Sequence, residues 1–416
     1  MSTVTTVSLQ GLLSKEGRRD PYPCYAELHR NGPVCRLDGK QDRFDIVVHG
    51  FDAVNKVLRD PTFRVTDSDY LDGGSMRTER AVPWRHHLAL RTLTSSIFFT
   101  DGPDHHRVRR LFSQEFTARR VAALEPAVVR MIDELLDRIA ELGAGGEPVD
   151  FMAEFALPLP SNVIGELLGV PEADRPWFPP RVRSFGAILD LGAGMWRYLQ
   201  GADSAAEELT GYFADLVARR RAEPRDDLVS ALVHAQVDCA ALGDAELLAN
   251  LITMFNAGFV TTTHLIGNGL TLLLDRPDLL ATLLAEPERT PAYVEEILRY
   301  EPPVHFNIRW VSEDTELMGV PVPAGSRVLV LLAAANRDPN RFADPDVFDP
   351  TRKDSQGLAF GGGLHYCLGA ALSRLEGQLA LPMVLRRFPD IALAEPPGVR
   401  DKLMLRGYDR LPVRVG

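Results

Sequence analysis

The stretch that decides the fold is Phe360-Gly-Gly-Gly-Leu-His-Tyr-Cys-Leu-Gly369, a glycine-rich loop followed at once by leucines at helical spacing. Cys367 therefore lies near a helix N-terminus, where unpaired backbone N–H groups and the helix dipole stabilise a thiolate. We expect this position to lower the pKa of the thiol. The glycines remove side-chain bulk, so a large flat group can lie against the backbone. As a bare pattern, the stretch also describes a strand-to-helix turn that happens to contain a buried cysteine.

The complete string F-G-x-G-x-H-x-C-L-G resembles the haem-binding loop of the cytochrome P-450 family. The resemblance implies that Cys367 is the axial thiolate ligand of haem b, iron protoporphyrin IX. It also implies that His365 approaches a haem propionate, that Phe360 packs beside the sulfur and that Gly369 belongs to the cofactor site. Thiolate ligation pushes electron density onto iron and favours O–O cleavage.

Two further segments carry donors that the resemblance assigns to the haem propionates. His105 and Arg109 are four residues apart on a helix expected to start after Pro103, and two cations on one face repel unless an anion lies between them. The segment is similar to the family's H-x-x-x-R element, and Arg309 matches a further propionate arginine. Without the resemblance, a basic surface helix would be the ordinary interpretation.

A long helix is expected from about Asp244 to Leu274, and its centre reads Thr253-Met-Phe-Asn-Ala-Gly-Phe-Val-Thr-Thr-Thr263. Threonine hydroxyls bond to the i−4 carbonyl, so we expect a local distortion near Ala257 and Gly258. The segment resembles the family's A-G-x-x-T motif. That resemblance implies that Thr261, with Thr262 beside it, assists oxygen activation, and that Ala257 and Gly258 open the groove where oxygen lies. A helix-packing notch is the alternative.

The family usually has an acidic residue where this sequence has Val260. That carboxylate is credited with relaying protons for O–O cleavage, so the proton route of this chain is open. Three routes remain: ordered water through Thr261 and Thr262, a nearby side chain such as His305 or Asn256, or a polar group of the substrate.

Glu296 and Arg299 are three residues apart on a helix expected from Pro291 to Tyr300 and can pair on one face. A solvated surface pair would be the ordinary reading. The pair resembles the family's E-x-x-R motif, and Arg352 stands where the family places a third partner. We expect a buried, structural network that braces the aperiodic stretch from 336 to 356.

One stripe of the long helix and the segment before Arg309 are expected to line the substrate pocket. The residues are Thr253, Asn256, Val260, Val304 and His305. The pocket would be more polar than a terpene or alkane binder needs, although His305 can equally be a satisfied core histidine. The segments that set specificity in the family, roughly 67–100 and 171–200, show no motif that identifies a substrate.

Composition narrows the class of protein. A chain of 416 residues with 45% hydrophobic content can bury a large core, and a net charge of −11 opposes attraction to nucleic acid or anionic lipid. The longest strongly apolar run, 328–335, is too short to span a bilayer, and the N-terminus lacks a signal-peptide pattern. Four scattered cysteines do not make a disulfide framework. We expect a cytoplasmic protein with neither nucleic acid nor membrane as a partner.

Helical periodicity predicts a mainly α fold with a small β-sheet region between roughly Thr315 and Ala334. A buried helical face is expected on Val121, Leu124, Val128, Ile132, Leu135, Ile139 and Leu142. The resemblance covers nearly the whole chain. It implies a single cytochrome P-450 domain over residues 1–416, with haem between the long distal helix and the cysteine-ligand loop and helix.

The function implied by the resemblance is that of a soluble bacterial haem-thiolate monooxygenase. It would hydroxylate, epoxidise, couple or desaturate a small secondary metabolite, free or bound to a carrier protein. Electrons would come from a ferredoxin and its reductase, and the protein would be a monomer. Arg107, Arg110 and Arg374 would form a basic patch on which the electron donor docks. The alternative, supported by Val260, is a haem-thiolate protein with non-oxygenase or peroxide-driven chemistry.

Overall fold

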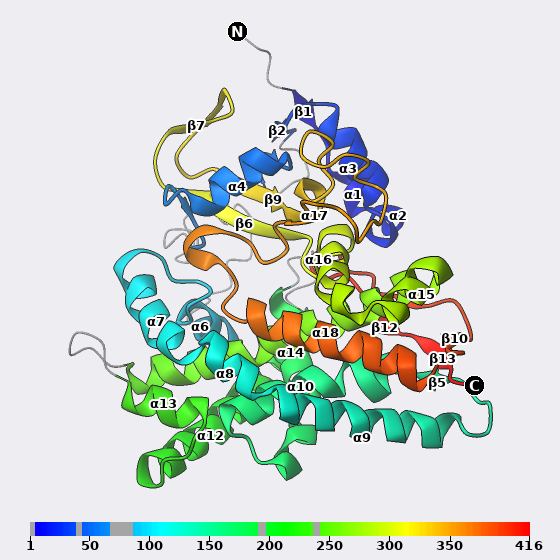
Figure 1. Ribbon diagram of the computed structural model, residues 1–416. Helices are drawn as coiled ribbons and strands as arrows, with labels where there is room; N and C mark the ends of the chain where they lie inside the picture. Colours follow the sequence, from blue (N-terminus) through cyan, green and yellow to red (C-terminus); the bar gives the residue numbers. More distant parts are fainter. Residues whose placement is uncertain (1–4, 39–43, 67–85, 190–196, 236–241) are drawn as a thin grey trace.

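The computed structural model describes residues 5–38, 44–66, 86–189, 197–235 and 242–416. Residues 67–85 and 190–196, which belong to the two segments expected to set specificity, lie outside these ranges. In Figure 1 a sheet with its flanking helices lies above a thick layer of helices.

Helices dominate the fold, as the periodicity predicts. The longer ones are α3 (Tyr22–His29), α4 (Phe51–Arg59), α7 (Gly102–Glu115), α9 (Glu125–Gly143), α10 (Pro158–Leu168), α11 (Phe178–Gly186), α12 (Leu199–Ala222), α14 (Asp244–Leu274), α15 (Pro277–Ala285), α16 (Thr290–Tyr300) and α18 (Ala370–Arg387). The shorter ones are α1 (Gln10–Leu13), α2 (Lys15–Arg19), α6 (Leu88–Thr94), α8 (Ala118–Ala123), α13 (Leu228–His234) and α17 (Leu332–Ala335). Short 3₁₀ or π helices lie at Met152–Ala156, Glu172–Trp177, Ala187–Leu189, Pro287–Arg289 and Gly363–His365.

The main sheet joins strands from the first 64 residues to the later strands at 306–311 and 327–331, so strand structure extends well beyond the region expected between Thr315 and Ala334, the end of which, from Leu332, is helical. Its strand order among the described residues is β1-β2-β3-β9-β6-β4, with β1 (Thr6–Val7), β2 (Val34–Leu37), β3 (Ile46–Val48), β4 (Phe63–Arg64), β6 (Phe306–Val311) and β9 (Arg327–Leu331). Strand β3 pairs with β9 in parallel, with Ile46 opposite Val328. Smaller sheets contain β5 (Val149–Asp150), β10 (Ala392–Leu393) and β13 (Pro412–Arg414); β7 (Thr315–Leu317) and β8 (Val320–Val322); and β11 (Gly398–Val399) and β12 (Tyr408–Arg410).

Helix α14 forms the centre of the helical layer and packs against α10, α12 and α18. Its bounds match the expected helix, but it continues through Ala257 and Gly258 without a break, so the expected distortion does not interrupt it. Among the described residues, α14 is the one helix long and apolar enough to cross a membrane, and 67% of its apolar window is buried inside the protein. It is the core helix of this fold.

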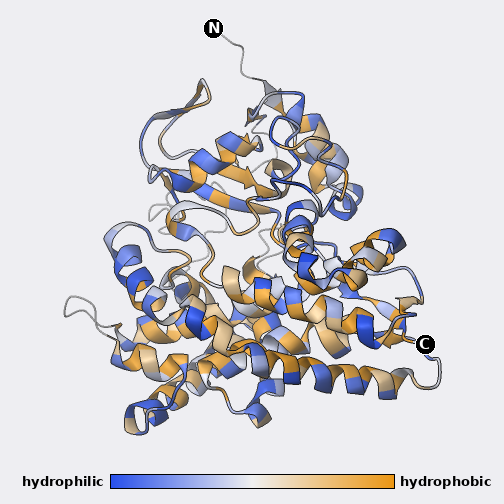
Figure 2. Cartoon of the chain, viewed as in Figure 1, coloured by the Kyte–Doolittle hydropathy of each residue, from blue (hydrophilic) through white to orange (hydrophobic). Residues whose placement is uncertain are grey.

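The face predicted on 121–142 is divided between two helices. Pro126 cannot donate a backbone hydrogen bond, and α8 ends at Ala123 before α9 begins at Glu125. Val128, Ile132 and Ile139 are buried as expected, whereas Leu142 is exposed at the end of α9. Figure 2 shows the alternation of apolar and hydrophilic residues along α9.

Candidate functional site

The cysteine loop is held by its backbone and by α4. The Cys367 N–H donates to the Phe360 carbonyl at 2.9 Å, which closes the loop just before α18. Gly361 and Gly363 have φ of 72° and 64°, in the left-handed region that favours glycine. A Cβ on Gly363 would lie 2.4 Å from the carbonyl oxygen of Leu58 in α4, so only glycine lets the loop approach this closely.

Cys367 is accessible at its surface although protein atoms surround its thiol. Burial raises its pKa, and this effect outweighs the Gly369 N–H and the charges of Arg109 and Arg374, which act to lower it. The expectation of a lowered thiol pKa was therefore wrong for the protein alone, because desolvation disfavours the charged form. A bound metal cation is the interaction that would stabilise the thiolate here.

Donors from α7 and β6 converge with His365 of this loop. His105 in α7 is 1% exposed, and neither of its ring nitrogens has a hydrogen-bond partner in the described part of the chain. Its ring centroid lies 4.2 Å from that of His365. Burial, followed by the charges of His365 and Arg109, lowers the pKa of His105 to about 4.

Arg309 reaches the same region from β6. It is 6% exposed, and its Nη1 donates to the carbonyl of Ile308 at 2.8 Å. Burial lowers its pKa to about 10, while Asp101 acts to raise it. Asp101 lies 3.4 Å from His365 Nε2 and accepts from the Val65 N–H at 3.1 Å. His105 and Arg309 are thus buried donors with Asp101 as the nearby carboxylate. Donors of this kind could also hold the two carboxylates of a haem.

The threonines of α14 face in different directions. Thr261 Oγ1 donates to the Ala257 carbonyl at 2.9 Å, as expected of a back-bonding threonine. Thr262 is buried, and its Oγ1 donates instead to Ser373 Oγ in α18 at 3.1 Å. Val260 is half-buried against the apolar core. Thr261 and Thr262 therefore belong to different surroundings although they are neighbours.

Gly258 faces α10. A Cβ there would lie 3.2 Å from Ile164 Cδ1, so glycine allows α14 and α10 to pack closely. This geometry is the helix-packing notch that the sequence left open as an alternative to a groove.

The expected pocket residues of α14 differ in their hydrogen bonds. Thr253 Oγ1 donates to the Ala249 carbonyl at 2.8 Å and is satisfied within its helix. Asn256 is 5% exposed, and its Oδ1 has no partner in the described residues. That oxygen faces the end of α11, where a Cβ on Gly186 would lie 2.7 Å away. Of Thr253 and Asn256, Asn256 is thus the residue with an unsatisfied buried acceptor in the described part of the chain.

His305 lies in a separate buried cluster near the N-terminal helices. Its Nδ1 is 3.1 Å from the Tyr25 hydroxyl, its ring is fully buried, and Glu301 is 3.9 Å from Nε2. Burial lowers its pKa well below the usual value. His305 is therefore a buried core histidine rather than a pocket residue, but it is only half satisfied, because its Nε2 has no hydrogen-bond partner among the described residues. Tyr25, 280 positions away, gave no signal in the sequence. Its half-buried neighbour Val304 bridges to Leu405.

Glu296, Arg299 and Arg352 form one cluster. Arg299 and Glu296 are fully buried and share two hydrogen bonds of 2.7 Å, while Arg352 Nε donates to Glu296 Oε1 at 3.3 Å. Arg299 also donates to the carbonyls of Asn336 and Pro345, both at 2.9 Å. The cluster thereby ties α16 to the aperiodic stretch before the cysteine loop.

The expected basic patch is largely neutralised. Arg107 pairs with Glu246 at 2.5 Å, and Arg374 pairs with Glu295 and with the Tyr366 hydroxyl. These pairs leave less positive charge on that face than the sequence suggests.

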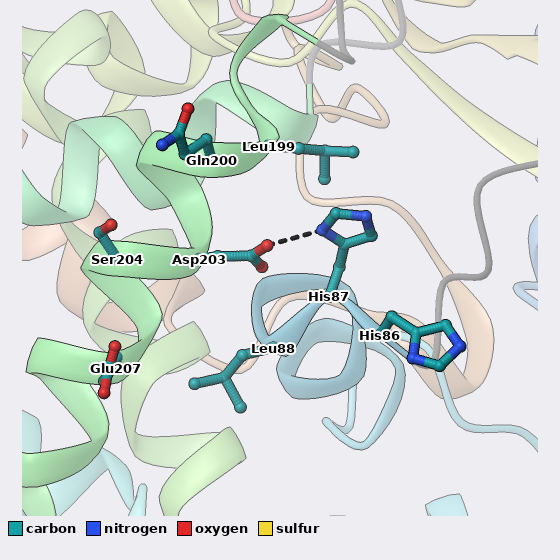
Figure 3. A pocket seen from close by; sticks show the side chains of 8 residues that line it. All are labelled: His86, His87, Leu88, Leu199, Gln200, Asp203, Ser204 and Glu207. Carbon is teal, nitrogen blue, oxygen red and sulfur yellow. Dashed lines mark hydrogen bonds and ion pairs between the residues drawn. The ribbon is translucent and has the colours of Figure 1, made fainter.

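A hollow of about 550 Å³ lies between α6 and the start of α12 (Figure 3), where the two segments expected to set specificity meet, although the sequence singled out none of its lining residues. It is lined by His86, His87, Leu88, Leu199, Gln200, Asp203, Ser204 and Glu207. His87 Nδ1 is 2.6 Å from Asp203 Oδ2, and Asp203 Oδ1 accepts from the Ala89 N–H at 2.9 Å. Asp203 therefore satisfies the N-terminus of α6 and fixes α6 to α12, which is a structural role.

Comparisons with known proteins agree with this geometry. Residues 29–396 match the model of the Cytochrome P-450 family. The chain is 39% identical to cytochrome P-450 monooxygenase PikC of Streptomyces venezuelae over 97% of this chain and 93% of the other. It is 40% identical to 6-deoxyerythronolide B hydroxylase of Saccharopolyspora erythraea over 95% and 96% of the two chains. Among solved structures, P450BioI in complex with an acylated acyl carrier protein has a TM-score of 0.87 and 32% identity, covering 96% and 100% of the two chains.

Proposed function

This chain belongs to the cytochrome P-450 family and is an oxygen-incorporating oxidoreductase, and from that premise we propose that it oxidises a small secondary metabolite bearing a hydrogen-bond donor. The observation that carries the proposal is the buried, unpartnered Asn256 Oδ1 beside α11. An unpaired buried acceptor costs free energy, which a donor on the substrate recovers. Relatives named as hydroxylases of 6-deoxyerythronolide B and of mycinamicin IV support the secondary-metabolite class.

The family binds haem b through a cysteine thiolate, and the residues of this chain fit that group. His105 is buried with both ring nitrogens unpartnered among the described residues, and Arg309 is a buried cation close to a single carboxylate. Two propionates would satisfy both. In this proposal Cys367 ligates the iron, and His105, Arg109, His365 and Arg309 hold the propionates.

Haem ligated by a thiolate supplies the oxygen-activating chemistry when bound. The protein's own residues bind and orient. Asn256 Oδ1 would accept a hydrogen bond from the substrate and so fix its orientation beside α14 and α11. Thr261, whose hydroxyl is half-buried and donates to Ala257, can rotate to pass a proton into the same space.

Electrons come in this proposal from a ferredoxin and its reductase, and the enzyme works in the cytoplasm as a monomer. The test supplies NADPH, ferredoxin, reductase and dioxygen to the haem-loaded protein, and compares it with peroxide alone. We expect product in the first reaction. Turnover driven by peroxide alone would instead favour the second candidate, a peroxide-driven enzyme, which Val260 supports by removing the usual acid.

The substrate is tested by shifts of the Soret band on titration with candidate metabolites, free and attached to a carrier protein. The structural relative solved with an acyl carrier protein motivates the second arm. Candidates with a free hydroxyl or N–H should bind more tightly than their methylated analogues. Asn256→Leu should reduce by about tenfold the ratio of the dissociation constants of the methylated and free candidates. Thr253→Val is the matched control, since its hydroxyl is satisfied within α14. Equal preference in Asn256→Leu would contradict the proposal.

A further inference from the structure

Asp101 occupies the N-cap position of α7 but does not cap that helix. Aspartate is among the residues preferred there, because its side chain can accept from the backbone N–H groups of the first turn. In this protein the Asp101 side chain makes no such bond. Pro103, the second residue of α7, has no N–H to offer. The half-buried carboxylate of Asp101 therefore binds groups outside its own helix.

The first of these groups belong to the chain just before residue 67. Asp101 Oδ2 accepts from the Val65 N–H at 3.1 Å and from the Thr66 N–H at 3.3 Å. The Thr66 hydroxyl in turn donates to the carbonyl of Phe99. Residues 65–66 and 99–101 stand at the two ends of the segment, roughly 67–100, that is expected to set specificity. These bonds of Val65, Thr66, Phe99 and Asp101 hold the two ends together, and we call them the base clamp.

The other group is the ring of His365 in the cysteine loop. Asp101 Oδ1 lies 3.4 Å from His365 Nε2. Burial acts to raise the pKa of Asp101, but the hydrogen bonds that it accepts outweigh burial and lower the pKa, so the side chain is a carboxylate at neutral pH. Because a carboxylate only accepts hydrogen bonds, His365 Nε2 is the donor, and this bond sets the orientation of the ring. One side chain therefore joins the base clamp to the cysteine loop.

The charge of Asp101 also reaches the buried donors on α7 and β6. Burial lowers the pKa of Arg309 and of His105, and the charge of Asp101 acts against that shift in both cases. The His105 ring lies against His365, with 4.2 Å between the centroids. One negative charge, fixed by backbone N–H groups, thus lies beside three of the residues assigned to the haem propionates. A fixed negative charge close to a haem favours the ferric over the ferrous state.

We propose that Asp101 is a positioning residue for the cofactor: it fixes the His365 ring against the base clamp, and its charge holds the reduction potential of the bound iron low. Asp101 touches neither the iron nor the substrate in this proposal. It acts through His365 and through its own field. The inference rests on the family's haem and on neither the substrate nor the electron donor assigned above.

The charge is tested by spectroelectrochemical reduction of the substrate-free holoenzyme. Asp101→Asn, which keeps the shape of the side chain and removes its charge, should shift the ferric–ferrous equilibrium about tenfold towards ferrous, a rise in potential of about 59 mV. Asp101→Glu, which keeps the charge, should stay near the wild-type potential. Asp104→Asn is the matched control, because it removes an exposed carboxylate from the first turn of the same helix and should change nothing. An unchanged potential in haem-loaded Asp101→Asn would overturn the proposal.

The clamp is tested by hydrogen–deuterium exchange of peptides that cover Val65 and Thr66. Asp101→Ala should speed exchange at both backbone N–H groups, because it removes their acceptor. Thr66→Val removes the hydroxyl that binds Phe99 and leaves the charge of Asp101 in place. It should therefore speed exchange but keep the wild-type potential. If Thr66→Val raised the potential as much as Asp101→Asn, the potential would follow the clamp alone and the assigned role of the charge would be refuted.

Exchange is measured with or without haem, so unchanged exchange in Asp101→Ala refutes the clamp even where a variant does not retain the cofactor. Potential and exchange are both measured without turnover. A wild type whose potential responds to Asp101→Asn but which forms no product with dioxygen and its electron donors would contradict the proposed function alone. An oxygenase whose potential does not respond to Asp101→Asn would contradict this inference alone.

Discussion

Single side chains without partners identify the cofactor face of this protein. His105 keeps both ring nitrogens unpaired among the described residues, and Arg309 is buried with a backbone carbonyl as its hydrogen-bond acceptor. Proteins rarely leave buried donors unpaired, so such groups indicate a ligand. The two lie on α7 and β6, far apart in the sequence and adjacent in the fold.

Arg309→Gln should weaken haem binding. Loss of a buried, charge-assisted hydrogen bond costs about 1.5–3 kcal/mol, which corresponds to roughly a 10- to 100-fold rise in the dissociation constant. The measurement is a haem titration of the apoprotein followed at the Soret band. Arg327→Gln, a partly exposed arginine on β9, is the matched control. An unchanged affinity for Arg309→Gln would argue against contact with a propionate.

Cys367→Ser should abolish the strongly red-shifted Soret band of the reduced carbon monoxide complex, because the hydroxyl does not supply the thiolate that causes the shift. Cys24→Ser, at a half-buried thiol in α3, should retain that band. The band surviving in Cys367→Ser would exclude this residue as the ligand.

At the scale of single residues, the sequence identified most residues of the candidate site but not the burial and neighbours of each side chain. The motif around Cys367 is unambiguous, yet the sign of the thiol's pKa shift depends on burial, which a motif does not state. The surroundings of His305 required the fold, because its partner Tyr25 comes from a distant segment. The proximity of Ser373 to Thr262 follows from how α18 packs on α14 and from no local pattern.

Among the elements, the long helices were predictable and the short strands were not. Helix α14 has the predicted bounds, because thirty residues of periodicity average out local exceptions. Strands β1 and β4 have two residues each, too few for any alternation to register. The stretch from 336 to 356 has no helix beyond α17 and no strand, as expected, and hydrogen bonds from Arg299 hold it.

Glu296→Gln should destabilise the fold by about 3–5 kcal/mol, because it leaves the fully buried Arg299 cation without its partner. Urea unfolding of the holoenzyme measures the change. Glu295→Gln is a control one position away, since its pair with Arg374 is about one-quarter exposed and should contribute less than about 1 kcal/mol. Equal losses in the two variants would show that burial does not decide the cost.

Across the whole molecule, buried neutral histidines make stability depend on pH. Burial, followed by the charge of Arg400, lowers the pKa of His264 to about 3, and Arg400 Nη1 lies 2.7 Å from its Nε2. Burial also lowers the pKa of His49 to about 3. In both cases the unfolded chain binds a proton that the folded protein excludes.

The contribution of these two histidines to the free energy of unfolding should therefore be fully present above about pH 6.5. It should be lost as the pH falls from there towards 3. Each histidine contributes a slope of about 1.4 kcal/mol per pH unit within that window. Denaturant unfolding at a series of pH values measures the slope, and His264→Gln should reduce it. A slope that is unchanged in His264→Gln would mean that this histidine is also protonated in the folded state.

The parallel pairing of β3 with β9 joins two strands that are synthesised far apart in time. Ile46 emerges early, but its partner Val328 is added only after about 15 to 55 s at ordinary rates of synthesis. During that interval the edge of β3 that β9 covers in the folded protein has no partner strand. Correct assembly of the upper layer in Figure 1 is therefore a late event in biosynthesis, and the nascent protein depends on that edge staying unpaired until β9 arrives.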